Sequence, residues 1–153
     1  MKIVIIGCGR VGSRLALRLE RGGHQVTVVD STREAFARLG GAFSGVTIQG
    51  SGMDLEVLKR AGCQGADIVF ALAAGDNRNL MIAQMARHQL GVERAVARLH
   101  DPVRAAKFRE MGVQTLCTTT VLEGLLEIYA QSGSFPELPG EMSIGGDASA
   151  LEI

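Results

Sequence analysis

The sequence predicts an α/β fold with a doubly wound parallel sheet of six strands, in the order 3-2-1-4-5-6, and helices on both faces. Three observations lead to this prediction. The 153 residues suffice for about one domain. Short apolar runs alternate with helical patterns along the chain, which indicates right-handed βαβ crossovers. The first apolar run is also followed at once by a glycine-rich loop that opens a helix.

Each element follows from its apolar spacing and from the residues that end it. Lys2–Ile6, for example, is an apolar run that stops at glycine, as expected of a strand buried on both faces. The predicted strands are Lys2–Ile6, Gln25–Val29, Val46–Gln49, Asp67–Leu72, Arg94–Leu99 and Val113–Cys117. The predicted helices run from Val11 to the glycines at 22 and 23, and over Ser31–Leu39, Leu55–Ala61, Asn77–Leu90, Pro102–Met111 and Val121–Gln131.

Composition excludes several classes of protein. No apolar run approaches the roughly 20 residues that span a bilayer, and the first residues do not form a signal peptide, so we expect a cytoplasmic protein without membrane insertion. The three cysteines lack metal or disulfide spacing, and no metal site is predicted. Residues 1–109 hold all 16 Lys and Arg against 9 acids, whereas residues 110–153 hold 7 acids and no base. The basic part suits an anionic ligand, but five Phe and one Tyr are too few to indicate nucleic-acid binding.

The loop Gly7-Cys-Gly-Arg-Val-Gly12 has the G-x-G-x-x-G spacing of a Rossmann-like dinucleotide site. Gly7 permits the tight turn, Gly9 lets a pyrophosphate approach the backbone, and Gly12 lets the helix pack closely. The helix N-terminus offers free N–H groups and a partial positive charge, and Arg10 adds a guanidinium. A glycine turn that serves packing alone is the alternative interpretation.

Asp30 ends the second strand, where a carboxylate accepts hydrogen bonds from ribose hydroxyls and repels a 2′-phosphate. This favours NAD(H) or ATP/ADP over NADP. Arg33 is also placed to meet a 2′-phosphate, although a surface role is the preferred interpretation.

From Ala66 onward the motifs A-D-x-V, D-x-x-N-L, A-R and R-x-x-D-P follow one another, at Ala66-Asp67, Asp76 to Leu80, Ala86-Arg87 and Arg98 to Pro102. With the glycine loop they resemble the TrkA-N or RCK (KTN) domain family, the cytosolic nucleotide-binding regulators of potassium channels and transporters. The resemblance covers about residues 1–131. It implies a potassium channel or transporter subunit as membrane partner, a location beside the inner membrane through that partner, and a homodimer through the last helix, Val121–Gln131, that can assemble into a ring.

The resemblance and the fold together give a set of nucleotide-binding residues. Arg98 is expected to reach the distal phosphates, and the end of the fourth strand to wall the adenine. Relatives usually have Gly-Asp where this chain has Gly50-Ser51, which removes a carboxylate near the adenosine. The predicted site comprises Gly7, Cys8, Gly9, Arg10, Val11, Gly12, Asp30, Ser31, Arg33, Gly50, Ser51, Leu72, Ala73, Ala74 and Arg98.

Polar residues outside this set are expected to have structural roles. Asp76, Asp101 and Thr119 are predicted to cap helices, and Asn79 to lie in the first turn after Asp76. Residues 1–132 are predicted to form the nucleotide-binding domain, and residues 133–153 a Gly/Pro-rich acidic linker or the start of an absent second domain.

An NAD-dependent oxidoreductase, or the cofactor-binding domain of one, is the alternative function, because the same loop and acid serve dehydrogenases. Such an enzyme needs a substrate domain and an acid or base near the nicotinamide. The histidines, Tyr129 and Cys117 are better explained as scaffold, so no catalytic residue is predicted.

Overall fold

A computed structural model describes residues 1–137, and the chain divides into two units after Cys117. The first unit, Met1–Cys117, contains a six-stranded sheet with its helices. The second unit begins at Thr118 and contains one helix in its described part.

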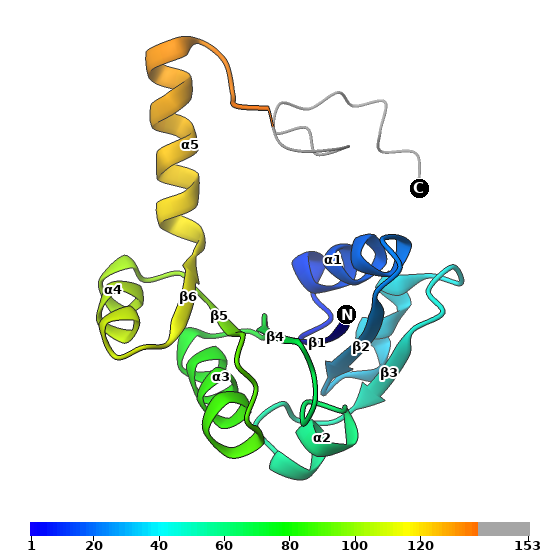
Figure 1. The fold of residues 1–153 in the computed structure, drawn as a ribbon. Helices are drawn as coiled ribbons and strands as arrows, with labels where there is room; N and C mark the ends of the chain where they lie inside the picture. The colour runs from blue at the N-terminus through cyan, green and yellow to red at the C-terminus, as the bar shows by residue number, and fades with distance from the viewer. Residues whose placement is uncertain (138–153) are drawn as a thin grey trace. The chain divides into compact units, whose positions relative to one another are not determined.

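The sheet is parallel throughout, and its strand order is β3-β2-β1-β4-β5-β6, so the predicted topology is confirmed (Figure 1). The strand bounds differ from the predicted ones by no more than one residue at each end. The strands are β1 (Lys2–Ile6), β2 (Gln25–Asp30), β3 (Val46–Gln49), β4 (Ile68–Ala71), β5 (Ala95–Leu99) and β6 (Gln114–Cys117).

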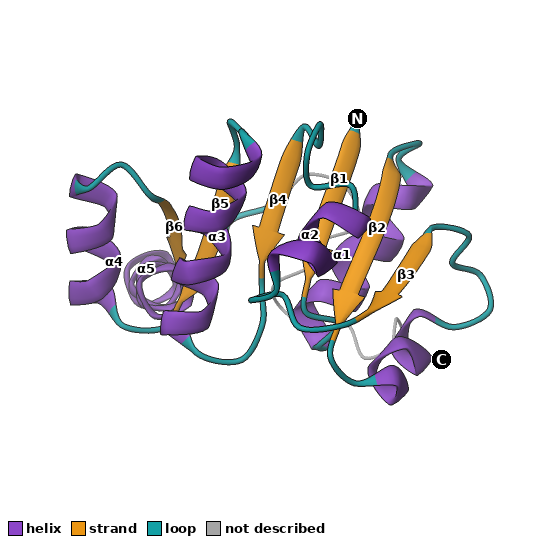
Figure 2. Ribbon diagram, turned by 90° about the horizontal axis from the view of Figure 1, so that it is seen from below, coloured by secondary structure: helices purple, strands orange, loops and turns teal. Residues whose placement is uncertain are grey.

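The helices of the first unit cover both faces of the sheet, as predicted. One core includes Leu58, Ile82 and Ala105 from α2, α3 and α4, and the other includes Ala16 and Leu39 from α1 and η1. Figure 2 accordingly shows α2 and α3 in front of the strands and α1 behind them. The helices are α1 (Arg10–Arg21), the 3-10 helix η1 (Arg33–Leu39), α2 (Leu55–Arg60), α3 (Asp76–Leu90) and α4 (Pro102–Glu110).

The predicted helix over Ser31–Leu39 is thus shorter and is of the 3-10 type. Its ends show the i to i+3 bonding of that type, since the Ala35 N–H donates to Thr32 O and the Gly40 N–H donates to Ala37 O. The tighter turn still places Ala35 and Leu39 in the core beside α1.

The capping predictions have mixed outcomes. Asp101 caps α4 as predicted, because its Oδ1 accepts from the Val103 and Arg104 N–H groups at 2.9 and 3.1 Å, with Pro102 in first position. The prediction for Asp76 is wrong: Gly75 is the N-cap of α3, and the Asp76 carboxylate accepts hydrogen bonds from the loop after β5 instead.

The second unit contains α5 (Thr118–Ser132). This helix starts directly after β6, so Thr119 lies in its first turn and the prediction of Thr119 as its N-cap is wrong. None of its residues is buried, and Leu122 and Leu126 are 58% and 53% exposed. Tyr129 stacks on Phe135 with ring centroids 4.7 Å apart. Most of the predicted linker, residues 138–153, lies outside the described residues.

No helix among residues 1–137 is both long enough and apolar enough to span a bilayer.

Candidate nucleotide-binding site

The predicted site residues gather at one edge of the sheet, because they sit at or just after the carboxyl ends of five parallel strands. The glycine loop follows β1, and Asp30 is the last residue of β2. Gly50 and Ser51 follow β3; Leu72, Ala73 and Ala74 follow β4; and Arg98 is the penultimate residue of β5.

Two glycines of the loop are required by the fold itself. Gly7 has φ 111°, in the left-handed region, and a Cβ there would lie 2.8 Å from the Leu72 carbonyl and the Ala73 nitrogen. A Cβ on Gly12 would lie 1.9 Å from the Gly7 carbonyl oxygen. The loop therefore packs on the end of β4, and α1 packs on the loop, too closely for any side chain at either position.

Gly9 differs from both. Its backbone is extended, with φ −76° and ψ −170°, a conformation that any residue adopts. An added Cβ would have no atom within 4 Å among the described residues, and Gly9 is exposed. Neither backbone conformation nor a close contact therefore requires glycine at position 9.

Gly9 is also the N-cap of α1 and supplies no side chain to cap it. The first turn contains no acidic residue, and Arg10 and Val11 are exposed beside it. The helix therefore presents its N-terminal N–H groups and its partial positive charge next to Gly9.

Asp30 ties the glycine loop to β2, a role that the sequence reasoning missed. Its Oδ2 accepts a hydrogen bond from the Cys8 N–H at 2.7 Å, and its Oδ1 accepts from the Thr32 N–H at 2.9 Å. Each carboxylate oxygen has a second lone pair, so Asp30 is still able to accept from ribose hydroxyls.

The Cys8 side chain is fully buried behind this loop. Burial, and then the charge of nearby Asp30, raise the pKa of the Cys8 thiol to about 11. The thiol is therefore protonated near neutral pH, which argues against a redox role for it.

Gly50 and Ser51 form a turn beside Asp30. The Gly50 N–H donates to Asp30 O at 2.9 Å, and a Cβ on Gly50 would collide with the Val57 side chain at 2.7 Å. The Ser51 hydroxyl accepts from the Met53 N–H at 3.2 Å. Packing thus explains Gly50, and the Ser51 side chain helps to form the turn.

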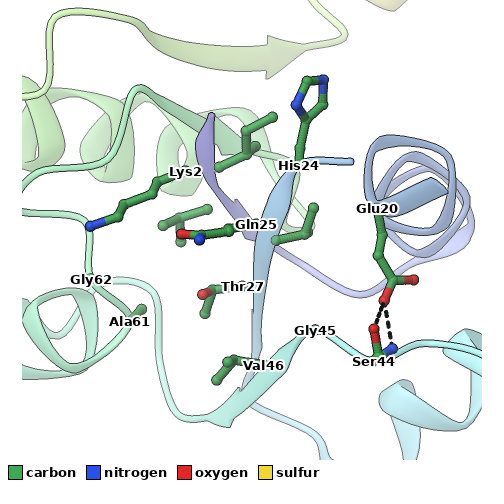
Figure 3. A pocket seen from close by; sticks show the side chains of 13 residues that line it. Lys2, Glu20, His24, Gln25, Thr27, Ser44, Gly45, Val46, Ala61 and Gly62 are labelled. Atoms are coloured by element: carbon green, nitrogen blue, oxygen red, sulfur yellow. Dashed lines mark hydrogen bonds between the residues drawn. The ribbon is translucent and has the colours of Figure 1, made fainter. Parts of the chain in front are cut away.

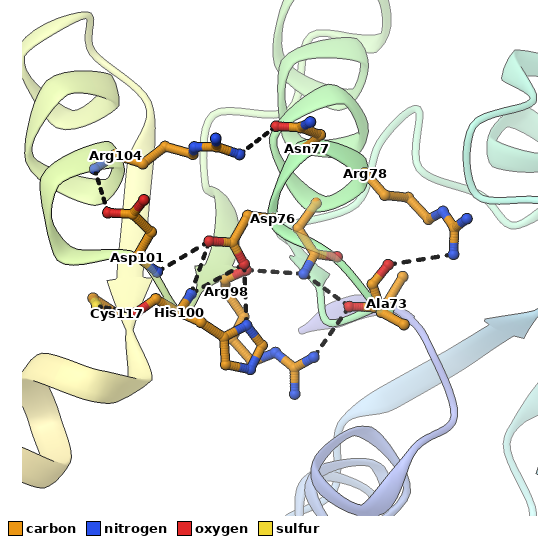
Figure 4. A network of polar contacts seen from close by, with 11 residues as sticks. Ala73, Asp76, Asn77, Arg78, Arg98, His100, Asp101, Arg104 and Cys117 are labelled. Atoms are coloured by element: carbon orange, nitrogen blue, oxygen red, sulfur yellow. Dashed lines mark hydrogen bonds and ion pairs between the residues drawn. The ribbon is translucent and has the colours of Figure 1, made fainter.

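A network of polar contacts joins the ends of β4 and β5 (Figure 4). Ala73 O accepts from Asn79 Nδ2 at 2.9 Å and from Arg98 Nη2 at 3.1 Å. Asn79 Nδ2 also donates to Arg98 O at 2.9 Å. Arg98 is therefore held at the end of β4. Asn79 is buried at the centre of the network, and the sequence reasoning placed it only in a first helical turn.

Asp76 extends the same network toward α4. Its carboxylate accepts from the His100 and Asp101 N–H groups at 3.0 and 3.1 Å and contacts His100 Nδ1 at 3.0 Å. Burial acts to raise the pKa of Asp76, but the hydrogen bonds from Asp101 and His100 outweigh it and hold the pKa below its ordinary value.

Other predicted residues are not drawn into these contacts. Within residues 1–137, the side chains of Arg10 and Arg33 make no hydrogen bond or ion pair, and both are exposed. Val11, Ser31 and Ala74 are exposed as well. They border the loop and the strand ends without being part of their hydrogen-bonded frame.

A hollow of about 410 Å³ lies elsewhere, at the edge where β1 and β2 begin (Figure 3). Lys2, Gln25, Thr27 and Val46 line it, together with Gly62, and none of the predicted site residues does. The glycine loop and the N-terminus of α1 follow the carboxyl end of β1 instead, so we place the candidate nucleotide site at the carboxyl edge.

No group of three or more His, Cys, Asp or Glu side chains is placed to hold a metal ion in the part of the chain that the structure describes.

The fold resembles solved structures of low sequence identity. The TrkA-N domain of the inner membrane protein ybaL from Escherichia coli has a TM-score of 0.72 and 21% identity, covering 83% of this chain and 95% of that one. GsuK bound to ADP has a TM-score of 0.71 and 24% identity, and the match covers 86% of this chain and 35% of that one. The GsuK channel bound to NAD has a TM-score of 0.66 and 24% identity, and the match covers 79% of this chain and 22% of that one.

Sequence comparison identifies the family. The Trk system potassium uptake protein TrkA of Streptomyces coelicolor is 42% identical over 137 residues, which are 89% of this chain and 61% of the relative. The chain spans about half to three fifths of the first curated relatives that it matches. Residues 3–119 match the TrkA-N domain, so the resemblance predicted from the motifs is confirmed, and the chain belongs to the TrkA-N domain family.

Proposed function

We propose that this chain is a nucleotide-sensing regulatory domain of a potassium transport system. It binds NAD(H) or ATP/ADP at the carboxyl edge of its sheet, and the bound nucleotide controls a membrane channel or transporter. The observation that carries the proposal is Gly9, because neither its backbone conformation nor a close contact requires glycine there.

A diphosphate explains Gly9 directly. Phosphate oxygens that bind the N–H groups at the start of α1 must pass close to the backbone of residue 9, where a side chain would displace them. Arg10, exposed and without an ion-pair partner in residues 1–137, adds a cation at the same end of the helix.

The other predicted residues complete the site. Asp30 accepts the ribose hydroxyls, Leu72, Ala73 and Ala74 wall the adenine, and Arg98 reaches the distal phosphate or the second nucleotide half. The remaining members border these groups: Cys8, Val11, Ser31, Arg33, Gly50 and Ser51. Because Asp30 would lie beside a 2′-phosphate and repel it, NADP is disfavoured.

Relatives support a role in potassium transport. The Streptomyces coelicolor relative is a Trk system potassium uptake protein, and GsuK, a channel, has been solved with NAD and with ADP. By analogy, this domain would work in the cytoplasm, at the inner membrane, through a potassium channel or transporter subunit. A regulator of this kind needs only a coupling of about 1–3 kcal/mol between ligand and partner.

The exposed apolar residues of α5 support a homodimer through Val121–Gln131, which can assemble further into a ring. Val121, Leu122, Leu126, Ile128 and Tyr129 are each between 42% and 58% exposed. Large apolar side chains gathered along one helix are typical of a surface that another subunit covers. Residues 1–132 would then form the working domain, with residues 133–153 as a linker or the start of a second domain.

The experiment is a calorimetric titration of the protein with ATP, ADP, NAD+, NADH and NADPH, repeated on Gly9→Ala. Gly41→Ala is the matched control, since Gly41 is likewise exposed, has no positive φ, and leaves 4 Å of open space around an added Cβ. We expect Gly9→Ala to lower the melting temperature slightly, because alanine is a poorer N-cap than glycine, and Gly41→Ala to keep it. Only Gly9→Ala should lose nucleotide affinity, by tenfold or more.

Two outcomes would contradict the proposal. If Gly9→Ala bound nucleotide with wild-type affinity, the diphosphate would not lie against the glycine loop. Oxidation of NADH with a small carbonyl substrate in the same samples would favour the oxidoreductase alternative.

A further inference from the structure

The N-terminal turn of α3 connects the two strand ends that border the proposed site. Asn79 is completely buried, and its Nδ2 donates one hydrogen bond to Ala73 O and one to Arg98 O, both at 2.9 Å. Arg98 Nη2 donates to the same Ala73 oxygen at 3.1 Å. Figure 4 shows Ala73 and the Arg98 guanidinium facing one another beside this turn. One backbone carbonyl therefore positions both the amide and the guanidinium.

The neighbouring peptide, between Leu72 and Ala73, supports the glycine loop. A Cβ on Gly7 would lie 2.8 Å from the Leu72 carbonyl carbon and oxygen and from the Ala73 nitrogen, so the loop rests directly on the Leu72–Ala73 peptide bond. Ala73 belongs to both peptides, since its nitrogen lies beside Gly7 and its carbonyl oxygen binds Arg98. The two parts of the proposed phosphate site thus meet at Ala73, and the Asn79 side chain holds the carbonyl oxygen of that residue.

Two buried polar atoms in this arrangement have no hydrogen-bond partner within the described residues: Asn79 Oδ1 and Arg98 Nε. Leaving such atoms unpaired raises the energy of the folded state. An apolar residue at position 79 would have avoided the cost of the unpaired Asn79 Oδ1. A buried asparagine there is better explained by its two donated hydrogen bonds, which hold the Arg98 backbone carbonyl and the Ala73 carbonyl that accepts from the Arg98 guanidinium.

We propose that Asn79 is a positioning residue that aims Arg98 at the distal phosphate of the bound nucleotide. The proposal rests on the nucleotide binding proposed above, and Asn79 itself touches no ligand. Without its amide, Ala73 O and Arg98 O lose a common donor. The Arg98 side chain then loses its fixed distance from the glycine loop, while Asp30, at the other end of the site, still holds the loop through the Cys8 N–H.

The proposed role of Asn79 predicts a loss of affinity whose size depends on the ligand. ADP carries a distal phosphate and AMP does not, so the ratio of their dissociation constants reports on Arg98. We expect Asn79→Ala and Arg98→Met each to lower the preference for ADP over AMP by about tenfold to a hundredfold, the range expected for a hydrogen bond to a charged group. We also expect the double variant to lose no more than either single variant, because both act through one contact.

Asn77→Ala is the matched control. Asn77 lies in the same turn of α3 and accepts a hydrogen bond from Arg104 Nη1, but it has no hydrogen bond to Ala73 or Arg98 among the described residues. Its removal should leave the ratio unchanged. A ratio that stays at the wild-type value in Asn79→Ala, with only the melting temperature lowered, would overturn the proposal and make Asn79 purely structural.

A measurement on the wild-type protein covers the case in which Asn79→Ala does not fold. The side-chain amide resonances of Asn79 should shift when ADP binds and shift much less with AMP, and equal shifts with both would overturn the proposal. Different results would refute the proposed function and the role of Asn79. A wild-type protein that binds neither ADP nor AMP refutes the proposed function, whereas wild-type binding with an unchanged ratio in Asn79→Ala refutes only the role of Asn79.

Discussion

Replacing Asp30 by alanine should destabilise the protein even without ligand, because the carboxylate holds the glycine loop. The Cys8 N–H, which donates to Asp30 Oδ2 at 2.7 Å, belongs to a residue with no exposed surface and would be left unpaired in the interior. A buried donor left without a partner costs about 1–3 kcal/mol. The Thr32 N–H is on an exposed residue, so water replaces its bond to Asp30 at little cost.

We therefore expect Asp30→Ala to lower the free energy of unfolding by about 2 kcal/mol, which for a unit of this size is roughly 6–12 °C in melting temperature. Urea unfolding without nucleotide measures it. Asp101→Ala is the control, since its carboxylate also accepts from two backbone N–H groups, but on the exposed residue Val103 and the half-buried Arg104. The loss of that helix cap should cost only about 1 kcal/mol.

Equal or smaller destabilisation in Asp30→Ala than in Asp101→Ala would refute the reasoning, because it would mean that the Cys8 N–H does not depend on Asp30. A confirmed difference has a practical consequence for binding assays. A loss of nucleotide affinity in an Asp30 variant would then have two causes, a missing ribose contact and a displaced loop. Gly9→Ala is therefore the cleaner probe.

Two further predictions concern ionisable groups. Because hydrogen bonds from His100 and Asp101 outweigh burial and hold the pKa of Asp76 below its ordinary value of 3.8, its stabilising contribution is complete above that value and is lost as the pH falls below it. The difference in unfolding free energy between wild type and Asp76→Asn should therefore shrink from pH 5 to pH 3 in urea titrations, and a constant difference would count against this. Burial raises the pKa of Cys8 to about 11 and that of Cys63 to about 12, so neither thiol of the native protein should react with Ellman's reagent at pH 8 faster than the chain unfolds.

The sheet was predictable because each strand can be recognised from a short stretch of sequence. Buried parallel strands such as Lys2–Ile6 appear as short apolar runs, and crossover handedness then leaves few possible strand orders. The glycine loop and Asp30 were found for the same reason, since their spacing lies within one βαβ unit. The remaining candidate positions came from the family resemblance and from the strand ends, including Arg98, whose contact partner Ala73 is 25 residues away.

What the sequence could not indicate depends on contacts between distant segments. Asp76 precedes a helix and so looks like a cap, but its partners are in the loop after β5, 24 and 25 residues further on. Asn79 is a polar residue in an amphipathic helix, and only the folded structure shows that it is fully buried between two strand ends. The helix expected from Val121 begins at Thr118. Its start was predicted too late because three consecutive threonines are a local signal for a cap rather than for a continuous helix.

The bond between Asp30 and the Cys8 N–H holds the glycine loop in shape without a ligand, so in the proposed binding mode the loop is pre-organised. A pre-organised loop costs little entropy to occupy, and it treats alike all ligands that share an adenosine diphosphate. A ligand changes a conformational equilibrium only through unequal affinity for the two states. If the domain distinguishes NADH from NAD+, or ATP from ADP, the discrimination must therefore arise away from the loop, at the β5 end of the site.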